Sequence, residues 1–220
     1  MHPDAGLLAA REQLARYSAR LVADGLAIGA AGNLSVRVAD IVAITPSGIS
    51  YDELAPDDIC MVTLSGHEID APETPSSELP MHLAVYAATG AGAVVHTHSA
   101  EVVALSATCD ELPAVHYAIA SLGGPVRVAP YTRFGSAGLA EAAVAALDGR
   151  RAAILQNHGA LCYGATLAAA YDRALLLEWL ARVYRLARGY GEPHTLSQAE
   201  LEEVAAEARR RRYGERRRTK

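Results

Sequence analysis

The sequence predicts a single α/β domain built as a three-layer α/β/α sandwich around a central, mainly antiparallel sheet. Three observations support this fold class. The 220 residues fit one domain of generous size, with no evident internal repeat or linker. Short apolar stretches typical of strands alternate with stretches whose apolar residues recur at helical spacing. Several of the expected strands are joined by short turns, which favours antiparallel pairing because parallel pairs need long crossovers.

The first half of the chain mixes two hairpins with two helices. The expected elements are a helix over 5–24, a hairpin over 34–45, a strand pair over 59–63 and 67–70, and a helix over 77–89. Gly25 is a plausible helix stop and Asp40 lies at the expected hairpin turn. Ser77 is the expected N-cap of the helix that follows the stretch APETPSS.

The second half alternates strands and helices more regularly. The expected elements are the strand AGAVVHTHS, a helix over 99–107, the strand VRVAP, a helix over 136–147, the strand RAAILQNHG with ALCYG as a return strand, and helices over 167–188 and 197–212. This order places helices on the faces of one sheet.

Lysine usage excludes two kinds of chemistry. The only lysine is Lys220, the last residue. A P-loop needs a lysine directly after its glycines, and Schiff-base catalysis needs a desolvated lysine. Carbonyl chemistry in this protein must therefore use another electrophile.

Charge divides the chain into two parts, a domain over 1–208 and a basic tail over 209–220. The tail carries a net charge of +7. Because the formal net charge of the whole chain is −5, residues 1–208 carry −12. An acidic body argues against nucleic acid as the main partner, because duplex affinity comes largely from neutralising phosphates. The tail is expected to be a solvated helix end, whose cations suit the helix dipole. An RNA-binding or membrane-surface arm is the alternative.

Cysteine usage and hydropathy bear on the compartment. Cys60, Cys109 and Cys162 are far apart and form no CxxC pair, which is typical of a reducing compartment. No stretch approaches the ~20 apolar residues of a membrane span, and the N-terminus lacks the basic and apolar regions of a secretory signal. We expect a cytoplasmic protein with no membrane partner.

Three histidines are candidate metal ligands. His96 and His98 stand at i and i+2 at the end of an apolar strand, so both imidazoles can lie on one face. Alone, this spacing fits satisfied strand-end histidines equally well. His158 ends another apolar strand, in QNHG, where the glycine relieves crowding. Three neutral imidazoles suit Zn²⁺ and leave one coordination position open for substrate.

Glu78 is a candidate fourth ligand or base. A carboxylate in the first turn of a helix often only compensates the helix dipole. Near a metal it could coordinate the ion, or act as a base once substrate takes its place. His82, four residues further on, is expected to pack or to support the site rather than bind the metal.

Three short loops could bind an anion without lysine. They are Gly32-Asn33-Leu34-Ser35, Thr45-Pro46-Ser47-Gly48 and Pro75-Ser76-Ser77. Backbone N–H groups in such turns, with hydroxyls and an amide beside them, can form an anion nest. Ordinary turn chemistry explains each loop equally well. Beside a three-histidine metal site, however, the loops predict a phosphate subsite.

The order of motifs resembles a known family. The motifs are AAGNLSVR, ITPSGI, PSSE, VVHTHS, PAVHYAIA, APYTRFG, LQNHGAL and RRYG. Over residues 7–214 the chain is similar to the class II, zinc-dependent aldolases of the aldolase/adducin family. The resemblance implies a single α/β domain in a cyclic homotetramer that cleaves a ketose 1-phosphate into dihydroxyacetone phosphate and an aldehyde, with one Zn²⁺ per subunit.

The resemblance also assigns roles to residues. It implies metal binding by His96, His98 and His158, with Glu78 as catalytic glutamate and metal neighbour. It implies phosphate binding by Asn33, Thr45, Ser47, Gly48, Ser76 and Ser77. It further implies a catalytic Tyr117 supplied by the neighbouring subunit and a C-terminal Tyr213 at the active site.

Related functions remain as alternatives. Sugar-phosphate epimerases of this scaffold carry aspartate where this chain has Glu78, so the glutamate favours cleavage. A decarboxylase or dehydratase would use the same scaffold. An adducin-like interaction protein would be expected to lack metal ligands, whereas all three histidines and Glu78 are present.

Overall fold

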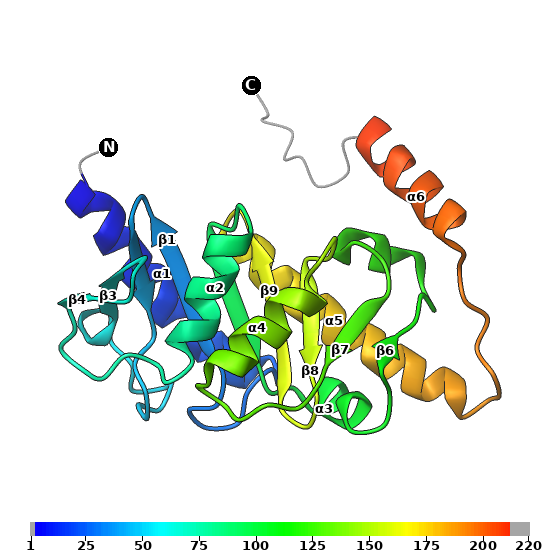
Figure 1. Ribbon diagram of the computed structural model, residues 1–220, viewed down its shortest axis with the longest axis horizontal. Helices are drawn as coiled ribbons and strands as arrows, with labels where there is room; N and C mark the ends of the chain where they lie inside the picture. Colours follow the sequence, from blue (N-terminus) through cyan, green and yellow to red (C-terminus); the bar gives the residue numbers. More distant parts are fainter. Residues whose placement is uncertain (1–2, 212–220) are drawn as a thin grey trace.

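The computed structural model describes residues 3–211, and within that range a nine-stranded sheet lies between two layers of helices (Figure 1). The strands are β1 (Asn33–Val38), β2 (Ile41–Ile44), β3 (Cys60–Thr63), β4 (Glu68–Asp70), β5 (Ala93–Thr97), β6 (Glu111–Leu112), β7 (Val126–Ala129), β8 (Ala152–Leu155) and β9 (Gly159–Gly164). The α-helices are α1 (Pro3–Ala23), α2 (Leu79–Ala88), α3 (Ala100–Ser106), α4 (Ala137–Ala146), α5 (Leu167–Arg188) and α6 (Gln198–Arg210). Two short 3-10 helices are η1 (Pro56–Asp58) and η2 (Tyr117–Leu122).

The sheet is mainly antiparallel, as the sequence predicts. Its strand order is β4-β3-β2-β1-β5-β9-β8-β7-β6, and only the β7–β8 pair is parallel. That pair is connected through α4, as a parallel crossover requires. β5 lies in the middle of the sheet, where all five of its residues are buried. His96 of β5 pairs with Asn33 of β1 on one side and with Leu161 of β9 on the other.

Helices cover both faces of the sheet, which confirms the three-layer arrangement. On one face, α1, α3 and α5 pack on residues such as Val95, and on the other, α2 and α4 pack on residues such as Val94 (Figure 1). Neighbouring residues of β5 thus serve opposite cores, because side chains alternate along a strand.

The start of α2 corrects one expectation from the sequence. Its N-cap position is held by Glu78, with no side-chain cap, rather than by Ser77. Ser76 takes over part of that role, since its carbonyl accepts from the N–H of Leu79 and its hydroxyl accepts from the N–H of Glu78. Ser77 instead donates its N–H to the hydroxyl of Ser47. The short elements β6 and η2 were also not predicted.

The last helix, α6, lies apart from the sheet (Figure 1). Ser197 and Glu200 form a capping box at its start, and Leu201 is its one buried residue. The helix runs to Arg210, so the first residues of the basic tail continue it, and Arg210 pairs with Glu207. No helix in the described part of the chain is both long and apolar enough to cross a membrane.

Candidate metal centre and active-site cavity

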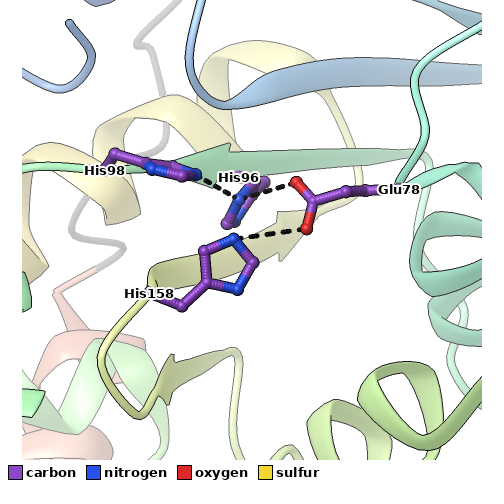
Figure 2. Close-up of side chains that lie close together, drawn as sticks. All are labelled: Glu78, His96, His98 and His158. Carbon is purple, nitrogen blue, oxygen red and sulfur yellow. Dashed lines mark hydrogen bonds and ion pairs between the residues drawn. The ribbon is translucent and has the colours of Figure 1, made fainter. Parts of the chain in front are cut away.

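Four side chains from separate elements converge on one point. His96 lies near the end of β5, His98 follows that strand, His158 lies in the turn between β8 and β9, and Glu78 begins α2 (Figure 2). One ligand atom from each of these residues lies within 4.8 Å of the others. The structure therefore brings together the four residues that the sequence nominates as a metal site.

The distances at this cluster are those of groups arranged around a small ion. Nε2 of His96 lies 2.9 Å from Nε2 of His98 and 2.9 Å from Oε2 of Glu78. Nε2 of His158 lies 3.3 Å from Oε1 of Glu78. The three imidazole rings meet edge to face, with centroids 4.7 to 4.9 Å apart.

Close backbone approach at the cluster explains two glycines. A Cβ on Gly159 would lie 2.1 Å from the carbonyl oxygen of Thr97, and a Cβ on Gly32 would lie 2.7 Å from that of His96. Gly32 also has a φ of +80°, which glycine adopts readily. These glycines let the β8–β9 turn and the β1 loop pack directly against the end of β5.

The hydrogen bonds around His96 leave a site that fits a cation. Nδ1 of His96 lies 2.9 Å from the carbonyl oxygen of Ala160, which can only accept, so Nδ1 carries the proton. Nε2 of a neutral His96 therefore presents a lone pair, which faces an oxygen of Glu78 and Nε2 of His98. Oε1 of Glu78 is buried and has no hydrogen-bond partner. A divalent cation among these acceptors would satisfy all of them, and second hydrogen bonds of this kind orient metal-binding histidines.

The electrostatics keep the cluster in the form that metal binding requires. Burial raises the pKa of Glu78, but His96, Asn33 and His158 favour the carboxylate more strongly and hold this pKa well below its usual range. Burial, with the charge of His96, lowers the pKa of His98 to about 3 and also lowers that of His158. These shifts favour an ionised Glu78 beside neutral His98 and His158, which are the ligand forms of these side chains.

The cluster opens into a cavity of about 470 Å³. The residues that line it are Ala30, Ala31, Gly32, Asn33, Pro46, Ser47, Gly48, Ser76, Ser77, Glu78, His98, Tyr131, Thr132, Phe134, Asn157 and His158. None of these described lining residues is a lysine or arginine. An anion in this cavity would therefore meet hydroxyl and backbone donors rather than a cationic side chain of the described lining.

The loops that the sequence nominates for phosphate lie together at this cavity. Thr45 and Ser76 are joined through a backbone hydrogen bond of 3.2 Å, and Ser47 donates to the carbonyl of Pro75. Ser47, Gly48, Ser76 and Ser77 line the cavity.

Two of the nominated phosphate residues lie deeper. Thr45 is fully buried, and its hydroxyl accepts from the N–H of Leu34, so it supports the loop from behind. Asn33 reaches the cavity wall, but its amide nitrogen donates to Oε2 of Glu78 at 2.9 Å.

Of the two nominated tyrosines, only Tyr117 is described by the structure, and it does not line the cavity of its own chain. Tyr117, the first residue of η2, is 58% exposed and is absent from the cavity wall. Its ring lies 4.4 Å from that of His116, which in turn meets Trp179 edge-on. Tyr213 lies outside the described residues.

Sequence reasoning missed part of the cavity wall. Tyr131 and Phe134 line the cavity and are 62% and 61% exposed, and Asn157 adopts a φ of 53° beside His158. The loop of Tyr131 is tied to the β8–β9 turn, because its N–H donates to the side chain of Gln156. The motifs APYTRFG and LQNHGAL contain these residues, but only the fold shows that the two segments adjoin.

Comparison with known proteins agrees with this geometry. The family described as "Class II Aldolase and Adducin N-terminal domain" matches residues 12–185. The chain therefore belongs to the class II aldolase and adducin family. Its relatives are named as aldolases, and the protein is a class II aldolase.

Two relatives and a solved structure match between 73% and 91% of the chain. A 5-deoxy-D-ribulose 1-phosphate aldolase of Bacillus thuringiensis serovar kurstaki is 39% identical over 89% of this chain and 93% of its own length. L-Fuculose phosphate aldolase of Escherichia coli (strain K12) is 40% identical over 73% of this chain and 75% of its own length. A solved structure of L-fuculose 1-phosphate aldolase superposes with a TM-score of 0.89, at 37% identity over 91% of this chain and 96% of that one.

Proposed function

We propose that this class II aldolase reversibly cleaves a ketose 1-phosphate related to L-fuculose 1-phosphate. The products are dihydroxyacetone phosphate and an aldehyde such as L-lactaldehyde. The observation that carries the proposal is the position of the Glu78–histidine cluster, which opens into the same cavity as the serine loops around Ser47 and Ser76.

His96, His98 and His158, with Glu78 as an exchangeable neighbour, would hold one Zn²⁺ per subunit. The donor set supports this assignment, because three imidazoles and a carboxylate are ligands that zinc prefers. A bound Zn²⁺ supplies a Lewis acid for the negative charge that develops on the substrate oxygens when the carbon–carbon bond breaks. It thus takes the place of the lysine that this chain lacks.

The serine loops would hold the phosphate. Ser47, Gly48, Ser76 and Ser77 offer hydroxyl and backbone donors at the cavity wall, while Asn33 and Thr45 complete the loops from behind. Fixing the phosphate places the carbonyl end of the substrate at a defined distance from the metal cluster, which is an orientation effect.

Two proton transfers complete the reaction. In the direction of synthesis, Glu78 removes a proton from the hydroxymethyl carbon of dihydroxyacetone phosphate, and Tyr117 donates a proton to the aldehyde oxygen. Because Tyr117 lies away from the cavity of its own chain, the proposal places it in the cavity of a neighbour within a homotetramer. Tyr213 would lie near the aldehyde end.

The free thiols of Cys60, Cys109 and Cys162 favour the cytoplasm as the compartment.

Two substrates are favoured by the comparisons and give different aldehydes. L-Fuculose 1-phosphate would give L-lactaldehyde, whereas 5-deoxyribulose 1-phosphate would give acetaldehyde. The aromatic rings of Tyr131 and Phe134 at the cavity wall suit the methyl end of either deoxy sugar.

Product analysis tests the proposal. Zinc-loaded protein would be incubated with dihydroxyacetone phosphate and a panel of aldehydes that includes L-lactaldehyde and acetaldehyde, and the condensation products would be measured. We expect carbon–carbon bond formation with at least one aldehyde. If no aldehyde condenses, while a pentulose phosphate is epimerised, decarboxylated or dehydrated, the related activity on this scaffold is the correct one. Binding to a protein partner without any turnover would instead favour the adducin-like alternative.

A further inference from the structure

A buried chain of hydrogen bonds runs from Glu78 away from the cavity and into the core between β1 and α2. Nδ2 of Asn33 lies 2.9 Å from Oε2 of Glu78, and Oδ1 of Asn33 lies 2.6 Å from Nε2 of His82. Nδ1 of His82 lies 2.7 Å from the hydroxyl of Ser35, which lies 2.8 Å from the hydroxyl of Tyr86. None of the four residues behind Glu78 is more than 5% exposed.

The chemistry of the groups fixes the direction of every bond in this chain. An ionised Glu78 can only accept, so Asn33 presents its amide N–H to the carboxylate and its carbonyl oxygen to His82. Nε2 of His82 must then carry a proton, and its Nδ1 must accept one from Ser35. Ser35 in turn accepts from Tyr86. Only the neutral Nε2–H tautomer of His82 satisfies this arrangement, and every donor points toward Glu78.

The chain gives the two oxygens of Glu78 different environments. Oε2 accepts the hydrogen bond from Asn33, whereas Oε1 is buried, receives no hydrogen bond and has Nε2 of His158 3.3 Å away. If the amide of Asn33 turned over, its carbonyl oxygen would face the carboxylate and repel it. His82 prevents this, because its N–H requires the oxygen of Asn33 on its own side.

We propose that His82 is a positioning residue for Glu78: through Asn33 it holds Oε2 in place and leaves Oε1 as the oxygen that exchanges the substrate proton. The inference rests on the proposed function, which assigns Glu78 as the base. His82 touches neither substrate nor metal in this scheme. It acts by fixing the amide of Asn33.

Substitutions at His82 test the proposal in the zinc-loaded protein. His82→Leu fills most of the volume but removes both ring nitrogens. We expect kcat for proton exchange of dihydroxyacetone phosphate to fall about 10- to 100-fold, the usual effect of a residue that orients a metal-site ligand. KM for dihydroxyacetone phosphate should stay within about twofold if phosphate binding is unaffected. His82→Gln should recover part of the loss, because its amide N–H can reach the carbonyl oxygen of Asn33.

Two control variants separate positioning from general loss of packing. Val85→Ala removes fully buried volume from the same helix without touching the chain, so it should lower stability and leave exchange unchanged. Tyr86→Phe removes the donor farthest from Glu78 and should reduce exchange less than His82→Leu does. An equal loss of exchange in Val85→Ala and His82→Leu would overturn the proposal.

Nitrogen NMR of the imidazoles tests the same proposal without any substitution. In the zinc-loaded wild type, His82 should be neutral, with its proton on Nε2 and with slow exchange against solvent. Finding the proton on Nδ1 would contradict the direction of the chain.

Glu78→Gln separates a failure of the base role of Glu78 from a failure of the positioning role of His82. Wild-type proton exchange in Glu78→Gln would refute the base assigned in the proposed function. An inactive Glu78→Gln beside a fully active His82→Leu would refute only the positioning role of His82.

Discussion

Nε2 of His96 and Oε2 of Glu78 lie 2.9 Å apart, although one residue belongs to the central strand and the other begins a helix on the face of the sheet. Both side chains are buried, and neither atom has a proton to share when His96 is neutral. With His96 in its neutral form two lone pairs meet here, and a cation bound between these atoms would remove their repulsion.

Metal removal should abolish activity. We expect dialysis against a chelator to stop aldol cleavage and Zn²⁺ to restore it, because the Lewis acid would be lost and returned. His98→Ala should lose both bound zinc and activity, whereas the matched variant His67→Ala, at an exposed histidine outside the cluster, should keep both. Cleavage at the full rate by protein that elemental analysis finds metal-free would refute the zinc assignment.

Removing the carboxylate charge should separate metal binding from proton transfer. Glu78→Gln keeps the shape of the side chain but cannot act as a base. We expect zinc to remain bound and proton exchange of dihydroxyacetone phosphate to fall about 10²- to 10⁴-fold, the range for a positioned base. Exchange would be followed by deuterium uptake from solvent. An unchanged rate would reduce Glu78 to a structural residue at the start of α2.

The candidate metal ligands could be nominated from the sequence because local patterns mark them. His96 and His98 share a strand, and His158 ends an apolar stretch before a glycine. The chain from Asn33 to Tyr86 could not be predicted in the same way. It depends on how α2 packs against β1, and no spacing within either segment encodes that contact.

The outer part of the cavity was hidden for a related reason. Tyr131 and Phe134 lie in a loop whose place is set by the parallel β7–β8 pair and by the side chain of Gln156. Long-range pairing of this kind leaves no periodic signal. The expected N-cap at Ser77 was wrong because α2 begins at Leu79, which places Glu78 at the cap position, while the N–H of Ser77 donates to Ser47 of a neighbouring loop.

Acid should destabilise the metal-free protein through the buried His82. Burial, with the charge of His96, lowers the pKa of His82 to about 3, from an ordinary value of 6.5. Between these two pH values, His82 binds a proton in the unfolded chain but stays neutral in the folded chain. The stabilising contribution is complete above pH 6.5 and is lost as the pH falls toward 3, at about 1.4 kcal/mol per pH unit.

Urea unfolding between pH 7 and pH 4 measures this effect. His82→Leu removes the group that takes up a proton on unfolding. Its free energy of unfolding should therefore fall less steeply with decreasing pH than that of the wild type, by about 1.4 kcal/mol per pH unit. Parallel pH profiles for the two proteins would show that His82 is protonated in the folded state.

Mixed oligomers test whether Tyr117 acts in a neighbouring subunit. Tyr117→Phe and Glu78→Gln should each be nearly inactive alone. In oligomers formed by random mixing of equal amounts, about a quarter of the shared sites would combine an intact Glu78 with an intact Tyr117. Recovery near that level, dependent on subunit exchange, would support a site between subunits. No recovery in verified mixed oligomers would mean that each site is built within one chain.

The positions of the four proposed metal ligands also bear on when during folding an ion could be captured. His158 reaches His96 only after β9 has paired with β5, and Glu78 reaches it only after α2 has docked on the sheet. Such non-local contacts form late, because loop closure must come first. An interaction absent from the transition state slows unfolding without speeding folding. In stopped-flow experiments, Zn²⁺ should therefore lower the unfolding rate and leave the refolding rate nearly unchanged. The ion would then give kinetic stability to the folded protein without nucleating its folding.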